Sequence, residues 1–156
     1  MTKKSAGLLV YRTRNSETEV LLVHPGGPFF AKKDLGSWGI PKGEFTDEEE
    51  ALDAARREFT EETNTRVDGI FRELKPIKLK SGKMIYAWAI HAEPDLTSFQ
   101  SNTFTMEWPP NSGEMKEFPE VDKAEWFTLE EAKNKISEGQ QELIKELENI
   151  LNNSLI

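Results

Sequence analysis

The chain has 156 residues, which suits one domain with a proper core, and it is 37% hydrophobic and 31% charged, as expected of a soluble globular protein. Its formal net charge of −8 argues against a general nucleic-acid-binding protein, which would be basic. The chain has no cysteine, which excludes disulfides and a Cys nucleophile, and it has neither a membrane-spanning apolar run nor a signal-peptide pattern, so we expect a cytoplasmic protein.

The first part of the chain predicts two strands followed by a loop. Short apolar runs at residues 6–12 and 19–24, separated by polar residues, predict two strands. Prolines and glycines within 25–37 predict an irregular loop. The loop carries two aromatic residues and two lysines, which suit either contact with a base and a phosphate or a hydrophobic plug beside solvated charges. These residues are Phe29, Phe30, Lys32 and Lys33.

A helix is predicted within residues 43–65. Thr46 or Asp47 is a suitable N-cap, and Glu49 completes a capping box with Thr46. Asn64 tolerates the left-handed conformation that ends a helix. Three apolar residues recur at i, i+3 and i+7 and predict one buried stripe. They are Leu52, Ala55 and Phe59.

Three acids of this helix do not fit an ordinary solvated face. Glu58, Glu61 and Glu62 lie at i, i+3 and i+4, so we expect their carboxylates to converge. Like charges at this spacing destabilise a helix and raise each other's pKa. A divalent cation would remove this penalty, because hard cations bind carboxylate oxygens. The alternative is an exposed Glu-rich helix without a site, which the spacing disfavours.

The same segment fits the pattern G-x5-E-x7-R-E-U-x-E-E-x-G-U, in which U is apolar. The matching residues are Gly43, Glu49, Arg57, Glu58, Phe59, Glu61 and Glu62. Residues 43–65 therefore resemble the Nudix box, the mark of the Nudix hydrolase family. Asn64 and Thr65 stand where the family has Gly and an apolar residue. Asn is the next-best residue for positive φ, and neither departure removes a carboxylate.

The resemblance implies roles for individual residues. The implied metal ligands are Gly43 through its carbonyl, Glu58, Glu61, Glu62 and Glu120. Glu58 or Glu120 would be the general base, and coupled carboxylates leave both open. Arg57 and Glu49 would form an ion pair that orients the ligands, the alternative being a surface pair between Arg57 and Glu61.

The approach to the box, from Trp38 to Gly43, resembles the W-x-x-P-K-G sequence of several Nudix branches. Lys42 would then lie beside the metal and hold a phosphate as a point charge, rather than being a solvated turn residue. Trp38 is expected in the core.

The chain beyond the box predicts a further strand and then a long loop. In residues 84–91, Tyr86, Trp88 and Ile90 alternate with the residues of the other face. Tyr86 would either stack on a nucleobase of the substrate or pack in the core. Prolines and glycines predict an irregular loop over 93–119, of the kind that is usually functional or mobile.

The last third of the chain extends the resemblance. The stretch from Ser101 to Glu120 resembles a bacterial Nudix subgroup described as predicted NTP pyrophosphohydrolases. Nudix enzymes often carry a metal-binding or basic acid six residues before a Trp such as Trp126, and Glu120 matches. The alternatives to Glu120 in this role are Glu114, Glu117 and Asp122.

Thr128 is expected to cap a short helix, and the apolar stripe of the last helix is either core or dimer surface.

Together these patterns predict an α/β protein, the Nudix-type α/β/α sandwich around a mixed β-sheet, as one domain over residues 1–156. The implied function is Mg²⁺- or Mn²⁺-dependent hydrolysis of a nucleoside diphosphate linked to another group, with a dinucleoside polyphosphate or an NTP derivative as substrate. The alternatives are a dNTP-sanitising pyrophosphatase and a non-catalytic nucleotide-binding scaffold. We expect a small-molecule nucleotide as partner, no nucleic acid, no membrane, and a monomer or homodimer.

Overall fold

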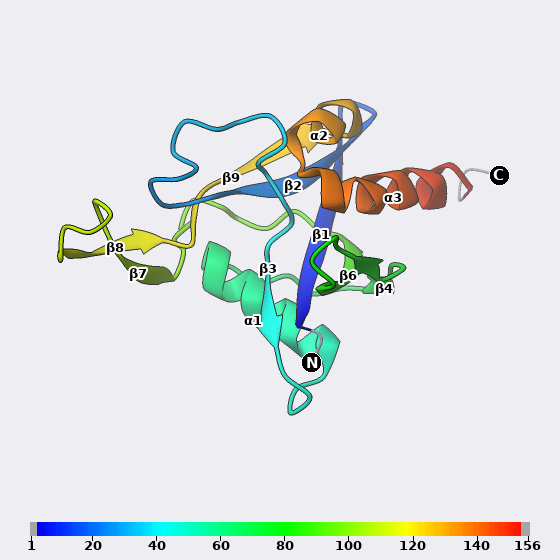
Figure 1. Cartoon of the computed structure of the whole chain (residues 1–156). Coiled ribbons are helices and arrows are strands. Elements are labelled where there is room, and N and C mark those ends of the chain that lie inside the picture. Colours follow the sequence, from blue (N-terminus) through cyan, green and yellow to red (C-terminus); the bar gives the residue numbers. More distant parts are fainter. Residues whose placement is uncertain (1–2, 154–156) are drawn as a thin grey trace.

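The computed structural model describes residues 3–153, which form a seven-stranded mixed sheet with helices on both faces and a separate two-stranded sheet at one side (Figure 1). This confirms the predicted sandwich. The strands of the main sheet are β1 (Lys4–Arg14), β2 (Glu17–Pro25), β3 (Lys42–Phe45), β4 (Arg72–Glu73), β5 (Ile77–Lys78), β6 (Met84–His91) and β9 (Val121–Thr128). The helices are α1 (Ala51–Thr63), α2 (Leu129–Lys135), the 3-10 turn η1 (Glu138–Gln140) and α3 (Gln141–Asn153).

Strand β1 is the centre of the sheet. It pairs in parallel with β6 along one edge, and along its other edge it pairs antiparallel first with β3, over residues 4–7, and then with β2, over residues 11–14. Beyond Val20, β2 leaves β1 and runs antiparallel to β9. The segment before β3 fills the opening, since Gly39 and Val23 exchange backbone hydrogen bonds of 2.8 and 3.0 Å. The sheet is therefore split where β2 and β3 diverge.

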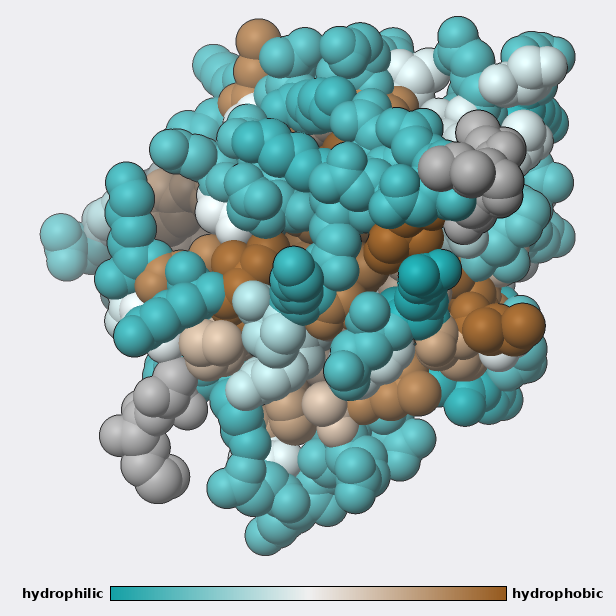
Figure 2. Space-filling view, turned by 90° about the vertical axis from the view of Figure 1, so that its right-hand side faces the viewer, coloured by the Kyte–Doolittle hydropathy of each residue, from teal (hydrophilic) through white to brown (hydrophobic). Residues whose placement is uncertain are grey.

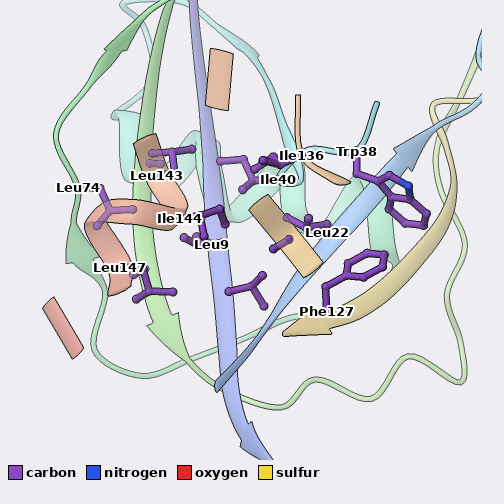
Figure 3. Packing of buried hydrophobic residues seen from close by; sticks show 14 residues of the cluster. Leu9, Leu22, Trp38, Ile40, Leu74, Phe127, Ile136, Leu143, Ile144 and Leu147 are labelled. Atoms are coloured by element: carbon purple, nitrogen blue, oxygen red, sulfur yellow. The ribbon is translucent and has the colours of Figure 1, made fainter. Parts of the chain in front are cut away.

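Alternation along the strands supplies two hydrophobic cores. Leu8 and Val10 face α1, whereas Leu9 faces α2 and α3 together with Leu22, Ile144 and other buried residues (Figure 3). Strand β6 alternates as predicted, with Trp88 on the α1 side. The apolar stripe of the last helix was predicted to be core or dimer surface. It is core, because its leucines and isoleucines pack in the same core as Leu9 and Leu22.

Helix α1 begins later than predicted. Its N-cap is Glu50, which makes no capping hydrogen bond through its side chain, so the predicted capping box is wrong. The reason is that β3 continues to Phe45 and a turn follows, in which Thr46 Oγ1 accepts from the Glu48 amide. The predicted end is confirmed, since Asn64 is left-handed with φ of 58° and its amide donates to Thr60 O.

The prediction of one irregular loop over 93–119 is wrong for part of its length. Strands β7 (Thr103–Glu107) and β8 (Met115–Pro119) form a hairpin, here called the arm, which projects from the body (Figure 1). Its prolines lie at the turn and at the strand end, where no ladder hydrogen bond is lost. Phe104 pairs with Phe118 across the arm, with ring centroids 6.0 Å apart.

Other local predictions hold. Thr128 and Glu131 form a reciprocal capping box at α2. Trp38 is buried, as expected. The loop over 25–37 is irregular, and Phe29 is exposed while its ring meets that of Trp108 edge to face at 5.4 Å. In the described part of the chain, no helix has the length and apolar character needed to cross a membrane.

Candidate active site

Arg57 lies at the centre of a group of acids on α1. Its guanidinium donates two hydrogen bonds to Glu49, at 2.9 and 3.0 Å, one to Glu58 at 2.8 Å, and a longer one to Glu61 at 3.2 Å. The hydrogen bond to Arg57 lowers the pKa of Glu49, and the same bond is the main cause that raises the pKa of Arg57. The two expected alternatives for Arg57, pairing with Glu49 and pairing with Glu61, are thus both present.

Glu58 is buried where α1 meets β3. Gly43 pairs with Ala6 on the α1 side of the sheet, and a side chain on Gly43 would overlap the Glu58 carboxylate. Burial raises the pKa of Glu58, the nearby charges of Glu61 and Glu49 raise it further, and Arg57 opposes them. The glycine at this position is therefore needed to let a buried carboxylate lie against the strand.

Glu62 is buried one helical turn further along α1 and is not held by Arg57. Burial, together with the charge of Glu58, raises the pKa of Glu62 to about 8. Lys42 opposes this shift through its positive charge and through a backbone hydrogen bond to the Glu62 carboxylate. Burial and the neighbouring Lys83 lower the pKa of Lys42, while Glu62 and Glu58 oppose that change. The buried Glu62 and the half-buried Lys42 thus form a pair whose opposite charges compensate each other.

Lys42, Glu62 and Glu120 line one cleft of about 230 Å³, here called the cleft, which lies where β2 and β3 diverge. Glu120 is held at the root of the arm, because its amide donates to Asn102 O at 2.8 Å and its carbonyl accepts from Gly26 N at 2.9 Å. The other lining residues are Val23, Pro25, Ser37, Trp38, Gly39, Ile40, Val121, Ser137 and Gln140.

A larger hollow of about 480 Å³ lies along the outer side of α1 and includes Arg56, Arg57 and Glu61. The buried Glu62 and the half-buried Lys42 open into the cleft instead. Buried ionisable groups with shifted pKa values mark functional sites, so the cleft is the better candidate.

The expected convergence of three carboxylates is only partial. Glu58 and Glu61 contact Arg57, whereas Glu62 interacts with Lys42. Among residues 3–153, no three acids or histidines are already arranged as a cation site. Glu58 and Glu62 nevertheless fit a divalent cation, because they are buried hard-oxygen donors whose pKa values are raised by burial and mutual repulsion, and a cation would relieve both.

The structure decides between the two expected roles of Tyr86 and adds a residue to the cleft. Tyr86 does not line the cleft; it is half-buried on the α1 side of the sheet, with its ring edge to face with Phe45 at 6.1 Å, so packing is its observed role. Gln140 lines the cleft but was not singled out by the sequence, because it belongs to no motif and lies far along the chain from Glu62. His24 is buried and has a structural role, with its Nδ1 2.8 Å from Asp122 Oδ1 and its Nε2 2.7 Å from Lys33 O.

The NUDIX domain family matches residues 1–147 of the chain. Among solved structures, the chain is similar to the NUDIX domain of Shewanella oneidensis NrtR in complex with ADP-ribose, with 17% identity, a TM-score of 0.66, and coverage of 97% of this chain and 89% of that one. It is also similar to a Caenorhabditis elegans Ap4A hydrolase, with 22% identity, a TM-score of 0.63, and coverage of 97% and 99%. A mutT/nudix family protein from Listeria innocua shares 15% identity, with a TM-score of 0.64 and coverage of 98% and 96%. No curated protein matches the chain.

Proposed function

Because the chain belongs to the Nudix family and is a pyrophosphohydrolase of nucleotide substrates, we propose that it hydrolyses the diphosphate linkage of a nucleoside diphosphate joined to another group, with Mg²⁺ or Mn²⁺ as cofactor. The observation that carries this proposal is the cleft, in which a buried acid on α1, a half-buried lysine on β3 and an acid before β9 lie together. These residues are Glu62, Lys42 and Glu120.

Nudix hydrolases generally use divalent metal ions, and the acids around the cleft suit one. The proposed ligands are Gly43 through its carbonyl, Glu58, Glu61, Glu62 and Glu120. A bound divalent cation supplies charge neutralisation for the diphosphate and lowers the pKa of bound water. Glu61 would have to leave Arg57 in order to bind the cation, whereas Glu58 and Glu62 are already buried side by side on α1.

The remaining side chains bind the substrate or orient the metal ligands. Lys42 would contact a phosphate oxygen, and its position in the lining of the cleft beside Glu62 supports this role. Arg57 positions Glu58 through its bond of 2.8 Å, and Glu49 holds Arg57 by two hydrogen bonds. Glu58 or Glu120 accepts the proton of the attacking water. The raised pKa of Glu58 suits this role, because a base is most effective when its pKa lies near the working pH.

For the substrate, we propose a dinucleoside polyphosphate or another NTP derivative, with a dNTP as the second candidate. The fold similarity to an Ap4A hydrolase supports the first. The cleft is smaller than the roughly 300–1,000 Å³ that encloses a drug-sized ligand, so it would hold only one end of a dinucleoside polyphosphate.

The test is a screen of the purified protein with Mg²⁺ or Mn²⁺ against dinucleoside polyphosphates, dNTPs, nucleotide sugars and diphosphoinositols, followed by phosphate analysis. We expect cleavage of a member of the first two classes and loss of turnover in excess EDTA. Full turnover in EDTA would refute the metal requirement. Cleavage of nucleotide sugars alone would refute both substrate assignments.

A further inference from the structure

The side chain of Gln140 has a fixed orientation in the wall of the cleft. It is only 7% exposed, and its Oε1 accepts a hydrogen bond of 3.0 Å from the Ile40 amide. An amide oxygen accepts and an amide nitrogen donates, so this bond settles which end of the side chain faces Ile40. The Nε2 end is consequently the free end, and within residues 3–153 no acceptor takes its protons.

Gly39 makes room for this amide. A Cβ added at Gly39 would lie 2.9 Å from Gln140 Nε2 and 3.0 Å from Oε1, closer than ordinary packing allows. The amide therefore lies over the backbone at Gly39, in the segment that fills the split between β2 and β3. Nε2 is thus a donor without a protein partner on the wall of the cleft, and such a donor points to an acceptor on a ligand.

The surroundings of Gln140 differ from those of the charged residues in the cleft. Its neighbours in the lining include the buried apolar residues Val23, Trp38 and Ile40, together with Ser137. A phosphate is usually recognised by lysine, arginine or several backbone amides, whereas a neutral donor among apolar groups suits an uncharged heterocycle with an acceptor on its edge. Lys42 and Glu62 supply the charged part of the same cleft.

We propose that Gln140 Nε2 donates a hydrogen bond to an acceptor on the nucleobase of the substrate, which makes Gln140 a specificity-determining residue. This inference rests on the proposed nucleotide-hydrolysing function of the cleft. It adds that the cleft recognises the nucleobase of the substrate. A base that presents an acceptor to Nε2 is favoured over one that presents a donor, because two donors facing each other leave both unpaired.

The kinetic test uses Gln140→Glu, which retains an acceptor for the Ile40 amide and removes the Nε2 donor. We expect kcat/KM for the preferred nucleotide to fall by roughly 10–100-fold, with a smaller loss for nucleotides of other bases. The matched control is Asn149→Asp, the same change from amide to carboxylate at an exposed position of α3 outside the cleft, which should leave the preference unchanged. An equal loss for every base would overturn the proposal.

A second variant guards against misfolding of the first. Gly39→Ala retains the Gln140 donor but displaces it, because the new methyl group meets the flexible end of the side chain. It should weaken the same base preference while the melting temperature changes little. A stable Gly39→Ala protein with an unaltered preference would contradict the proposal.

A binding measurement does not depend on turnover. In ¹⁵N-labelled protein, the Gln140 side-chain amide signal is identified by its loss in Gln140→Glu, and the four ribonucleosides and inorganic diphosphate are added separately. We expect the signal to shift with at least one nucleoside and to stay in place with diphosphate. A shift with diphosphate alone, or with none of these compounds, would overturn the inference. A nucleoside-induced shift in a protein that hydrolyses no nucleotide would refute the proposed function instead.

Discussion

The Arg57 guanidinium contacts carboxylates that come from both sides of it along the chain, Glu49 before α1 and Glu58 and Glu61 within it. Removing either Glu49 or Glu58 leaves Arg57 paired, but with different consequences. Glu49 is partly exposed and acts on the cleft only through Arg57, whereas Glu58 is buried against Gly43. The two acids therefore differ in their expected importance for turnover.

Replacing Glu58 by Gln should lower turnover by roughly 10²–10⁴-fold, because it removes a general base or metal ligand without changing shape. Glu49→Gln should cost about 10–100-fold, as is typical of a residue that orients a ligand. The metal-free melting temperature of Glu58→Gln should not fall, since a buried charge is removed. Glu130→Gln, at an exposed site on α2, is the control. A fully active Glu58→Gln protein at saturating metal would end the assignment of α1 as the catalytic element.

Glu62 predicts a pH dependence of the metal-free protein. Its pKa is about 8 when folded and roughly 4.3 in an unfolded chain, so between these values the folded protein holds a proton that the unfolded chain has released. The free energy of unfolding should therefore fall as pH rises from about 4.5 to about 8. Burial and the charges of Glu58 and Glu120 drive this loss, and Lys42 opposes it.

The measurement is denaturant unfolding in EDTA across this pH range. Glu62→Gln should flatten the decline, since a neutral amide does not titrate. Glu49 has the opposite sign and titrates below this range: Arg57 lowers its pKa, so its stabilising contribution is present above the unfolded pKa and is lost at lower pH. When the profile is extended below about pH 4.3, Glu49→Gln should therefore lose less stability than the wild type. Parallel pH profiles for the wild type and Glu62→Gln would contradict the buried, protonated state of Glu62.

At the scale of elements, the cleft is made by the meeting of segments from distant parts of the chain. α1 contributes Glu62, β3 contributes Lys42, and the root of the arm contributes Glu120. The arm itself pairs only within its own two-stranded sheet. It is joined to the body near the cleft, because Gly26 and Asn102 both hydrogen-bond to the backbone of Glu120.

Hydrogen exchange should show that the arm responds to substrate. A bound ligand that contacts Glu120 restrains the root of the arm, so we expect slower exchange within 103–119 when a nonhydrolysable substrate analogue and Mg²⁺ are added together. Segments of α3 distant from the cleft, such as the residues near Asn149, serve as the internal control and should exchange equally in both states. Identical exchange of the arm with and without the ligand would contradict its coupling to the site.

At the scale of the whole molecule, two hydrophobic cores stabilise the sheet from its two faces, and the charged residues of the cleft lie at the split between β2 and β3. Leu8 and Val10 pack under α1 and Leu9 packs under α3, so β1 is held from both faces. On the face shown in Figure 2, hydrophilic residues lie above and below a central band of hydrophobic ones. The whole chain has a net charge of −8. An acidic protein acting on an anionic substrate needs cations at its site.

Divalent cations should therefore stabilise the folded protein as a whole. A ligand at 100 times its dissociation constant adds about 2.7 kcal/mol, and a chain of this length gains roughly 2–4 °C per kcal/mol, so we expect a rise in melting temperature of roughly 5–10 °C. Calorimetry in Mg²⁺ against EDTA measures this. The double variant Glu58→Gln, Glu62→Gln should lose most of the rise. An undiminished rise in that variant would show that the cation binds elsewhere.

Local sequence was sufficient for much of this protein. The alternation in β6, the capping box at Thr128 and the left-handed Asn64 were all predictable, because each depends on residues within a few positions along the chain. The spacing of Glu58 and Glu62 likewise placed both acids on one helix. The resemblance of residues 43–65 to the Nudix box indicated the Nudix family, which the family match over residues 1–147 confirms.

Only the tertiary structure decided how these residues are partnered. Glu61 contacts Arg57 while Glu62 faces Lys42, and helical spacing cannot distinguish these outcomes, because β3 approaches only one side of α1. The sequence around Tyr86 is compatible with stacking on a nucleobase and with packing in the core, and only the position of β6 beneath α1 decides for packing. The cleft position of Gln140 depends on a contact with Ile40, 100 residues away. Such contacts form because the sheet splits between β2 and β3, and no periodicity in the chain records that split.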